Sequence, residues 1–208
     1  SVVCASIFAV VTSPAAGGPL VIAHRGASDA LPEHTPAAYR RAIAEGADGL
    51  ECDVRMSADR HLDCLHDARV DRTSSGRGSV ASMTLAELEA LDWGSWKAGS
   101  PGPDGMAGHS ALLTLEMLLD MVRGCGRRVD LAIETKHPNR FGGQVEEELA
   151  AVLARFDKET AADAVRCGVR MMSFSGLALR RMHRLRPELP LVYLMERVPW
   201  VYRDGSLP

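Results

Sequence analysis

The sequence predicts an α/β fold in which a parallel sheet is covered by helices. From residue 19 to residue 195, short apolar runs alternate with helical stretches, a pattern typical of parallel sheets. The 208 residues suit one domain at about 150 residues per domain, and 46% of them are apolar, enough for a sizeable core. We expect residues 1–18 to be an N-terminal extension, disordered or the remnant of a secretory signal, ahead of a domain over 19–208.

Six strands and five helices are expected from apolar periodicity and turn signals. Thr35 can cap the first helix, with Pro36 in its first position, and Thr84 with Glu87 forms a capping box. Thr114 begins a further helix. The strands are expected over 19–24, 48–54, 61–66, 128–135, 169–175 and 191–195, and the helices over 36–45, 84–91, 115–123, 144–156 and 176–186.

Two architectures fit this alternation, a doubly wound open sheet and a (β/α)8 TIM barrel. Neither GxGxxG nor GxxxxGK[ST] follows the first strand, which weakens a nucleotide-binding open sheet. A complete barrel has eight β/α units in about 250 residues. We therefore expect a barrel with only about six of its eight units in this chain, truncated at the C-terminus. Its two edge strands would be unpaired, so the isolated chain would be poorly stable or the native protein longer.

Composition excludes several classes of protein. The net charge of −3 and a pI near 6.2 argue against nucleic acid as a partner. No apolar run reaches the 18 residues or so of a membrane-spanning helix. Five scattered cysteines, an odd number without CxxC pairing, argue against a disulfide framework or structural zinc site. The odd cysteine count favours a reducing compartment, so we expect a cytoplasmic location rather than secretion. The sequence does not indicate the oligomeric state.

Ionisable side chains stand at the ends of four successive predicted strands. In a parallel sheet the carboxyl ends of the strands form one rim, where barrel enzymes build their active sites. Each group alone has an ordinary structural explanation, such as a solvated strand face, a hydrogen-bonded histidine or a simple salt bridge. Their joint placement on one rim favours a functional site. The residues are His24 and Arg25 after the first strand, Glu51 and Asp53 in the second, His66 after the third, and Glu134 and Lys136 at the fourth.

These residue types suit the cleavage of a phosphate ester. Three carboxylates without a thiolate suit a hard divalent cation such as Ca²⁺ or Mg²⁺. Arg25 and Lys136 would add positive charge for the oxygens of a phosphate group. His24 and His66 could divide the proton transfers, one accepting a proton from the attacking hydroxyl and the other protonating the leaving alkoxide.

Several segments together resemble the glycerophosphodiester phosphodiesterase family. The resemblance runs in order from about residue 19 to residue 195, and the combination of HRG, PE-x-T, E-x-D, HD and E-x-K is specific. RTSSGRGSV (72–80) corresponds to the family's connecting loop. The segments that carry the resemblance are AHRGA (23–27), PEHTPAAY (32–39), GADGLECDVRMSADRHLDCLHD (46–67), MTLAELEALDWGSW (83–96) and AIETKHP (132–138).

The resemblance implies a TIM-barrel enzyme that hydrolyses glycerophosphodiesters to glycerol 3-phosphate and an alcohol. It implies that His24 and His66 are the acid–base pair and that Arg25 and Lys136 contact the phosphate. Glu33 matches an acidic position beside the site, as a weaker candidate for binding or orientation. His34 and His137 lie near the expected mouth without an assigned role. The implied ligands of one divalent cation are Glu51, Asp53 and Glu134.

The sequence is also compatible with two other functions. A related phosphodiesterase of the lysophospholipase D or sphingomyelinase D type would carry an exposed apolar rim and turn over micellar lipid. A truncated homologue without activity would only bind a phosphodiester or a partner. The complete set of expected acid, base and ligand residues argues against such a binder. The sequence does not name the alcohol group or the physiological cation.

Overall fold

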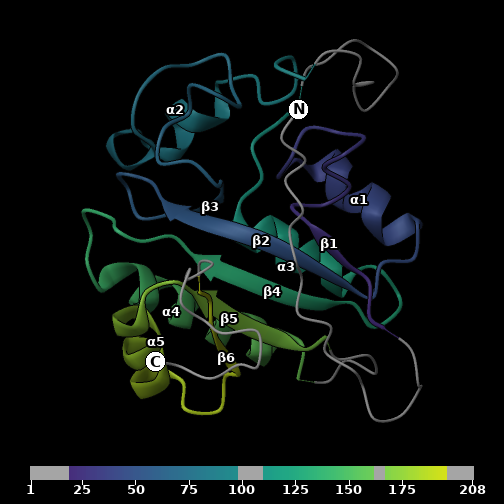
Figure 1. The fold of residues 1–208 in the computed structure, drawn as a ribbon, viewed down its shortest axis with the longest axis vertical. Helices are drawn as coiled ribbons and strands as arrows, with labels where there is room; N and C mark the ends of the chain where they lie inside the picture. Colours follow the sequence, from purple (N-terminus) through teal and green to yellow (C-terminus); the bar gives the residue numbers. More distant parts are fainter. Residues whose placement is uncertain (1–18, 98–109, 162–166, 196–208) are drawn as a thin grey trace, which may run out of the picture.

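Six strands form one sheet in the computed structural model, which describes residues 19–97, 110–161 and 167–195 (Figure 1). The predicted extension over 1–18 lies outside the described residues. The strands are β1 (Ile22–His24), β2 (Gly49–Met56), β3 (Leu62–Cys64), β4 (Asp130–Thr135), β5 (Val169–Ser173) and β6 (Leu191–Tyr193). The helices are α1 (Pro36–Ala44), α2 (Leu85–Glu89), α3 (Leu115–Arg123), α4 (Gln144–Glu159) and α5 (Gly176–Leu185), with a 3-10 turn at Val80–Ser82.

Five of these strands are parallel and follow one another across the sheet in chain order, β1-β2-β4-β5-β6. A doubly wound sheet would reverse its strand order at a switch point, whereas successive neighbours are the arrangement of a (β/α) barrel. The structure therefore confirms the predicted barrel class as a partial (β/α) barrel.

Strand β3 corrects the prediction of six parallel strands. It runs antiparallel to β2, with Val54 opposite Cys64 and Met56 opposite Leu62. Only residues 57–61 connect the two strands, too few for a parallel crossover, which needs a dozen residues or more. The sheet thus holds five parallel strands plus this hairpin strand within the described residues. The short gap was already visible in the sequence.

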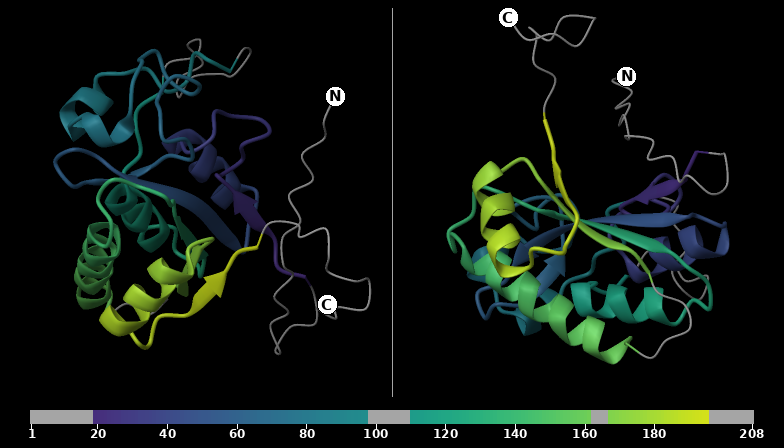
Figure 2. Two further views of the ribbon diagram at one scale, coloured as in Figure 1. Left: turned by 60° about the vertical axis from the view of Figure 1, so that its left-hand side comes forward. Right: turned by 90° about the horizontal axis from the view of Figure 1, so that it is seen from below.

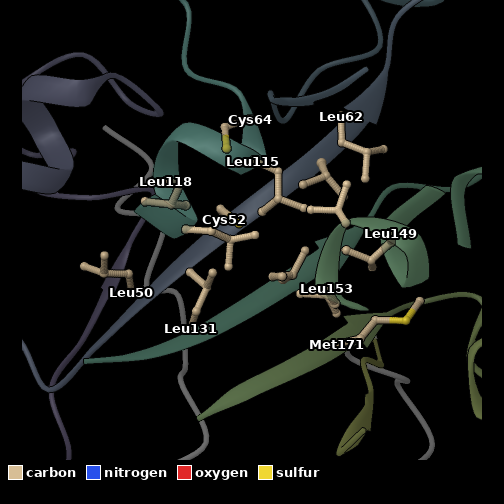
Figure 3. Packing of buried hydrophobic residues seen from close by; sticks show 14 of the residues in the cluster. Leu50, Cys52, Leu62, Cys64, Leu115, Leu118, Leu131, Leu149, Leu153 and Met171 are labelled. Atoms are coloured by element: carbon tan, nitrogen blue, oxygen red, sulfur yellow. The ribbon is translucent and has the colours of Figure 1, made fainter. Parts of the chain in front are cut away.

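The main core lies between the sheet and four helices, α1, α3, α4 and α5. Figure 2 shows α3, α4 and α5 on one side of the sheet. Alternate residues of β2 and β4 point into this core, among them Leu50, Cys52 and Leu131, which Figure 3 shows against α3 and α4. Because side chains alternate along a strand, the residues between them face the opposite side of the sheet. That opposite face carries the acidic residues.

The helix boundaries follow the predicted capping residues. The Thr35 hydroxyl accepts a hydrogen bond from the Ala38 amide at 3.3 Å, and Pro36 opens α1. Thr84 and Glu87 form the expected capping box of α2, and Thr114 caps α3. Helix α2 packs on a second, smaller apolar cluster away from the sheet. No helix in the described ranges is long and apolar enough to cross a bilayer.

Candidate active site

Strand register brings the predicted side chains into one group. His24 in β1 lies opposite Glu51 in β2, and Asp53 in β2 lies opposite Glu134 in β4. Glu51, Asp53 and Glu134 also lie on the face of the sheet away from the helices. The ends of β1 and β4 and the middle of the longer strand β2 therefore deliver an imidazole and three carboxylates to the same place.

The three carboxylates could hold one cation. Each offers an oxygen, and the three oxygens lie within 4.8 Å of one another, while all three residues are buried. Oxygens that bind one Ca²⁺ at about 2.4 Å are separated by distances of this order. Burial and the neighbouring Asp53 raise the pKa of Glu51 to about 8, and burial raises the pKa of Glu134. A divalent cation would neutralise this concentration of negative charge, so the donor set fits Ca²⁺ or Mg²⁺.

Two cations already contact the acidic group. Lys136 Nζ lies 2.8 Å from Asp53 Oδ1 and 2.7 Å from Glu134 Oε1. Arg25 Nε lies 3.1 Å from Asp53 Oδ2, and Arg25 Nη1 donates to Glu33 Oε1 at 3.1 Å. The two predicted phosphate-contacting residues therefore flank the carboxylates.

The turn after β1 requires the glycine of the HRG motif. Arg25 and Gly26 have φ angles of 59° and 80°, in the left-handed region. A Cβ at Gly26 would lie 2.8 Å from the Ala38 carbonyl carbon, so the turn packs directly on α1. This close contact holds the Arg25 amide at 3.1 Å from Glu51 Oε2.

Both candidate acid–base histidines lie at this rim. His24 Nε2 is 3.7 Å from Glu51 Oε2, and burial together with the charge of Arg25 lowers its pKa to about 4. His66 Nδ1 is 2.7 Å from Asp67 Oδ1, and burial lowers the pKa of His66 although this hydrogen bond opposes the shift. Although β3 is antiparallel, it returns towards the site, where the Leu65 amide donates to the Asp53 carbonyl at 3.0 Å. The hairpin therefore places His66 where the parallel strand was expected to.

Arg72 joins the two sides of the site and was missed in the sequence, where it opens the connecting loop. Its guanidinium donates to Asp67 Oδ2 at 2.6 Å and to Glu33 Oε1 at 2.7 Å. The bond from Arg72, above all, lowers the pKa of Asp67 to about 2. Burial would raise the pKa of Glu33, but the bonds from Arg72 outweigh it and lower the pKa. An ionic chain thus runs from Arg25 through Glu33, Arg72 and Asp67 to His66.

His34 lies at the site, near the mouth where the sequence placed it, but its partners were not predicted. It is buried, with Nδ1 at 2.9 Å from the Tyr39 hydroxyl and Nε2 at 2.9 Å from Asp53 Oδ2. The Tyr39 hydroxyl donates its own proton to the Glu51 carbonyl at 2.8 Å. The two ring nitrogens of His34 therefore connect the Tyr39 hydroxyl to the buried Asp53 carboxylate. Together with Lys136, His34 holds the pKa of Asp53 below its ordinary value despite burial.

His137 lies apart from this chemistry. Its Nε2 is 2.7 Å from Glu146 Oε1, and Glu146 is fully buried in α4. Asn139 Nδ2 lies 3.1 Å from the other ring nitrogen. His137 therefore fixes the segment after β4, which carries Lys136.

Comparisons with known proteins agree with this geometry. A model of the glycerophosphoryl diester phosphodiesterase family matches residues 24–207. The chain is 52% identical over 179 residues to a Mycobacterium tuberculosis protein named "probable glycerophosphodiester phosphodiesterase 1", covering 86% of this chain and 65% of that protein. It is 37% identical to a Bacillus subtilis glycerophosphodiester phosphodiesterase, covering 85% of this chain and 59% of the relative. The chain thus spans less than two thirds of the length of these curated relatives.

A solved structure is similar in fold. It is an Oleispira antarctica phosphodiesterase in complex with the product sn-glycerol-3-phosphate, with a TM-score of 0.68 and 29% identity. The match covers 89% of this chain and 70% of that one. The strand order, the acidic rim and the family match lead to one conclusion. This chain belongs to the glycerophosphoryl diester phosphodiesterase family.

Proposed function

We propose that the chain hydrolyses glycerophosphodiesters to glycerol 3-phosphate and a free alcohol, with a bound divalent cation. The observation that carries this proposal is the strand register, which sets His24 opposite Glu51 and Asp53 opposite Glu134 on one rim. The similar Oleispira antarctica phosphodiesterase, in complex with sn-glycerol-3-phosphate, supports the substrate class.

Glu51, Asp53 and Glu134 would hold the cation, and Ca²⁺ or Mg²⁺ suits their oxygen ligands. When bound, the cation supplies positive charge that stabilises the phosphate oxygens in the transition state. Arg25 and Lys136 lie beside these carboxylates and would contact the same phosphate group. Glu33, held by Arg25 and Arg72, would orient Arg25.

His24 and His66 would carry the protons. A hydroxyl, from water or from the neighbouring glycerol carbon, forms a bond to phosphorus and gives its proton to one imidazole. The bond from phosphorus to the departing alcohol breaks, and the alkoxide takes a proton from the other imidazole. With water as the attacking group, the products are glycerol 3-phosphate and the alcohol. With the glycerol hydroxyl, the alcohol leaves and a cyclic glycerol phosphate forms, and water then opens this ring to give glycerol 3-phosphate. Asp67 would keep the His66 ring oriented through its bond to Nδ1.

The test is release of glycerol 3-phosphate from glycerophosphocholine, with and without EDTA. We expect activity that EDTA removes and added Ca²⁺ or Mg²⁺ restores, and near-total loss in His24→Ala. His183→Ala, a change at an exposed histidine of α5, is the matched control and should keep full activity. Ordinary turnover by His24→Ala would contradict the acid–base assignment. Substrate binding without turnover in the unchanged protein would favour the non-catalytic alternative.

A lysophospholipid substrate is the second candidate, because apolar side chains are exposed beyond β5 and β6. Phe174 is 46% exposed and directly follows β5, Leu177 is 60% exposed, and Met195 is 70% exposed. Such residues could contact an acyl chain. Turnover of glycerophosphocholine and lysophosphatidylcholine should be compared under the same conditions. Faster turnover of the long-chain lipid would show that a lysophospholipid, and not the water-soluble diester, is the preferred substrate.

A further inference from the structure

A cavity of about 340 Å³ adjoins the candidate active site. It lies between the end of β2, the 3-10 turn at Val80–Ser82 and the segment that follows β4. Its walls are largely apolar and include Met56, Val80 and Phe141. Lys136 lines the cavity and also contacts Asp53 and Glu134. The cavity and the acidic rim therefore share one side chain.

The charges at this cavity are all positive. Arg55, Lys136 and Arg140 line it, and no carboxylate does among the described residues. Arg55 donates from Nε to the His66 carbonyl at 2.8 Å, and Lys136 is bound to the acidic group. Arg140 lies over the Phe141 ring at 5.0 Å and donates a hydrogen bond to the Ser82 hydroxyl at 3.4 Å. In the part of the chain that the structure describes, no ion pair occupies Arg140.

We propose that this cavity receives the alcohol part of the diester and selects an uncharged polyol over an amino alcohol such as choline, an inference that rests on the proposed function. Because Lys136 lines the cavity, a phosphate that it binds would direct one of its ester substituents into this space. The guanidinium groups offer hydrogen bonds to hydroxyl oxygens, while the apolar walls, Phe141 among them, contact the carbon skeleton. A quaternary ammonium in the cavity would be repelled by Arg140, which has no ion pair among the described residues, and no carboxylate of the described residues lines the cavity to bind it.

The proposal makes Arg140 a specificity-determining residue. It is exposed and touches none of the proposed metal or acid–base residues, so its replacement should leave the chemical step intact. Arg140→Glu would put a negative charge at the mouth of the cavity, which attracts an ammonium and repels no neutral polyol. Arg184→Glu is the matched control, because Arg184 is exposed near the end of α5.

The experiment compares kcat/KM for glycerophosphoinositol and glycerophosphocholine. The unchanged protein should prefer glycerophosphoinositol, and Arg140→Glu should reduce this preference about fivefold, the size expected of one exposed charge interaction. Arg184→Glu should leave the preference unchanged. A preference of the unchanged protein for choline, or an identical preference in Arg140→Glu, would overturn the inference.

A second variant tests the volume of the cavity. Ala81 lines the cavity, and Ala81→Phe would fill part of it. We expect KM for glycerophosphoinositol to rise about tenfold, which corresponds to a loss of about 1.4 kcal/mol of binding free energy. The control substrate is glycerol 3-phosphate esterified with methanol, whose small methyl group does not need the cavity, so its KM should not change. Equal changes for both substrates would place the alcohol elsewhere. A protein that turns over none of these diesters would contradict the proposed function itself, which separates that failure from a wrong choice of cavity.

Discussion

Arg72 donates hydrogen bonds to both carboxylate oxygens of Glu33, at 3.0 Å from Nη1 and 2.7 Å from Nη2, although 39 residues separate the two in the chain. The same guanidinium binds Asp67 and lies 5.9 Å from the Trp96 ring centroid. A planar guanidinium can hold two carboxylates at fixed angles, which a lysine cannot do. Arg72 thus connects the side of the site that carries Arg25 to the side that carries His66.

We expect Arg72→Lys to lower kcat about 10- to 100-fold with a smaller change in KM. The lysine keeps the charge but loses the paired hydrogen bonds, so Asp67 no longer holds His66 at a fixed angle. Arg69→Lys is the matched control, because Arg69 is exposed and its one ion pair among the described residues is with Asp71. Steady-state kinetics on glycerophosphocholine measure both parameters. Full kcat in Arg72→Lys would show that charge alone suffices at this position.

His34→Ala should destabilise the fold by about 1.5–3 kcal/mol, because it removes a hydrogen bond to the buried Asp53 carboxylate, which keeps Arg25 and Lys136 as partners. Tyr39→Phe removes a hydroxyl from the same chain of hydrogen bonds and should cost about 1 kcal/mol. Urea unfolding of the two variants and of the unchanged protein measures both values. Equal losses in the two variants would mean that the bond from His34 to Asp53 contributes no more to stability than the Tyr39 hydroxyl does.

Asp63 should make the protein less stable as pH rises. It is fully buried in β3, and neither carboxylate oxygen has a hydrogen-bond partner in the described ranges. Burial, with the charges of Asp59, Glu116 and Glu89, raises its pKa to about 8. The folded state therefore keeps a proton that the unfolded chain loses above about pH 4, so this group lowers the unfolding free energy between about pH 4 and pH 8.

Asp63→Asn is the corresponding variant, because the amide cannot ionise and has nearly the same shape. Its stability relative to the unchanged protein should increase from pH 5 to pH 8, by at most about 1.4 kcal/mol per pH unit. Asp71→Asn should show no such trend, because the bonds from Arg69 and the Gly78 amide lower the pKa of Asp71 rather than raise it. A difference between Asp63→Asn and the unchanged protein that stays constant from pH 5 to pH 8 would mean that Asp63 does not titrate in this range.

Calcium or magnesium should raise the free energy of unfolding. A cation that binds only the folded chain stabilises it by about 2.7 kcal/mol at 100 times its Kd. Asp53→Asn and Glu134→Gln each remove one proposed ligand and should abolish the stabilisation, whereas Glu159→Gln, at an exposed acid of α4, should keep it. Thermal unfolding with and without the ion provides the measurement, and no activity is needed. Stabilisation that persists in both ligand variants would place the ion elsewhere.

Much of the fold and most of the candidate site could be predicted from the sequence, because the signals are local. Alternation placed Leu50 and Cys52 on one face of β2 and Glu51 and Asp53 on the other, and capping residues marked the starts of α1, α2 and α3. Local signals of this kind depend on residues within a few positions of one another. The direction of β3 was predicted wrongly although the short connection at 57–61 was visible.

The amino-acid sequence alone determined the strand–helix alternation, the capped helices and the chemical types of the residues at the strand ends. Only the tertiary structure decided that Asp53 lies opposite Glu134 and that the buried His34 contacts Asp53. It also decided that Arg72 binds Glu33. Strand register and contacts between distant segments depend on how the whole core packs. No run of neighbouring residues encodes that packing, so these contacts become visible only when the helices close on the sheet.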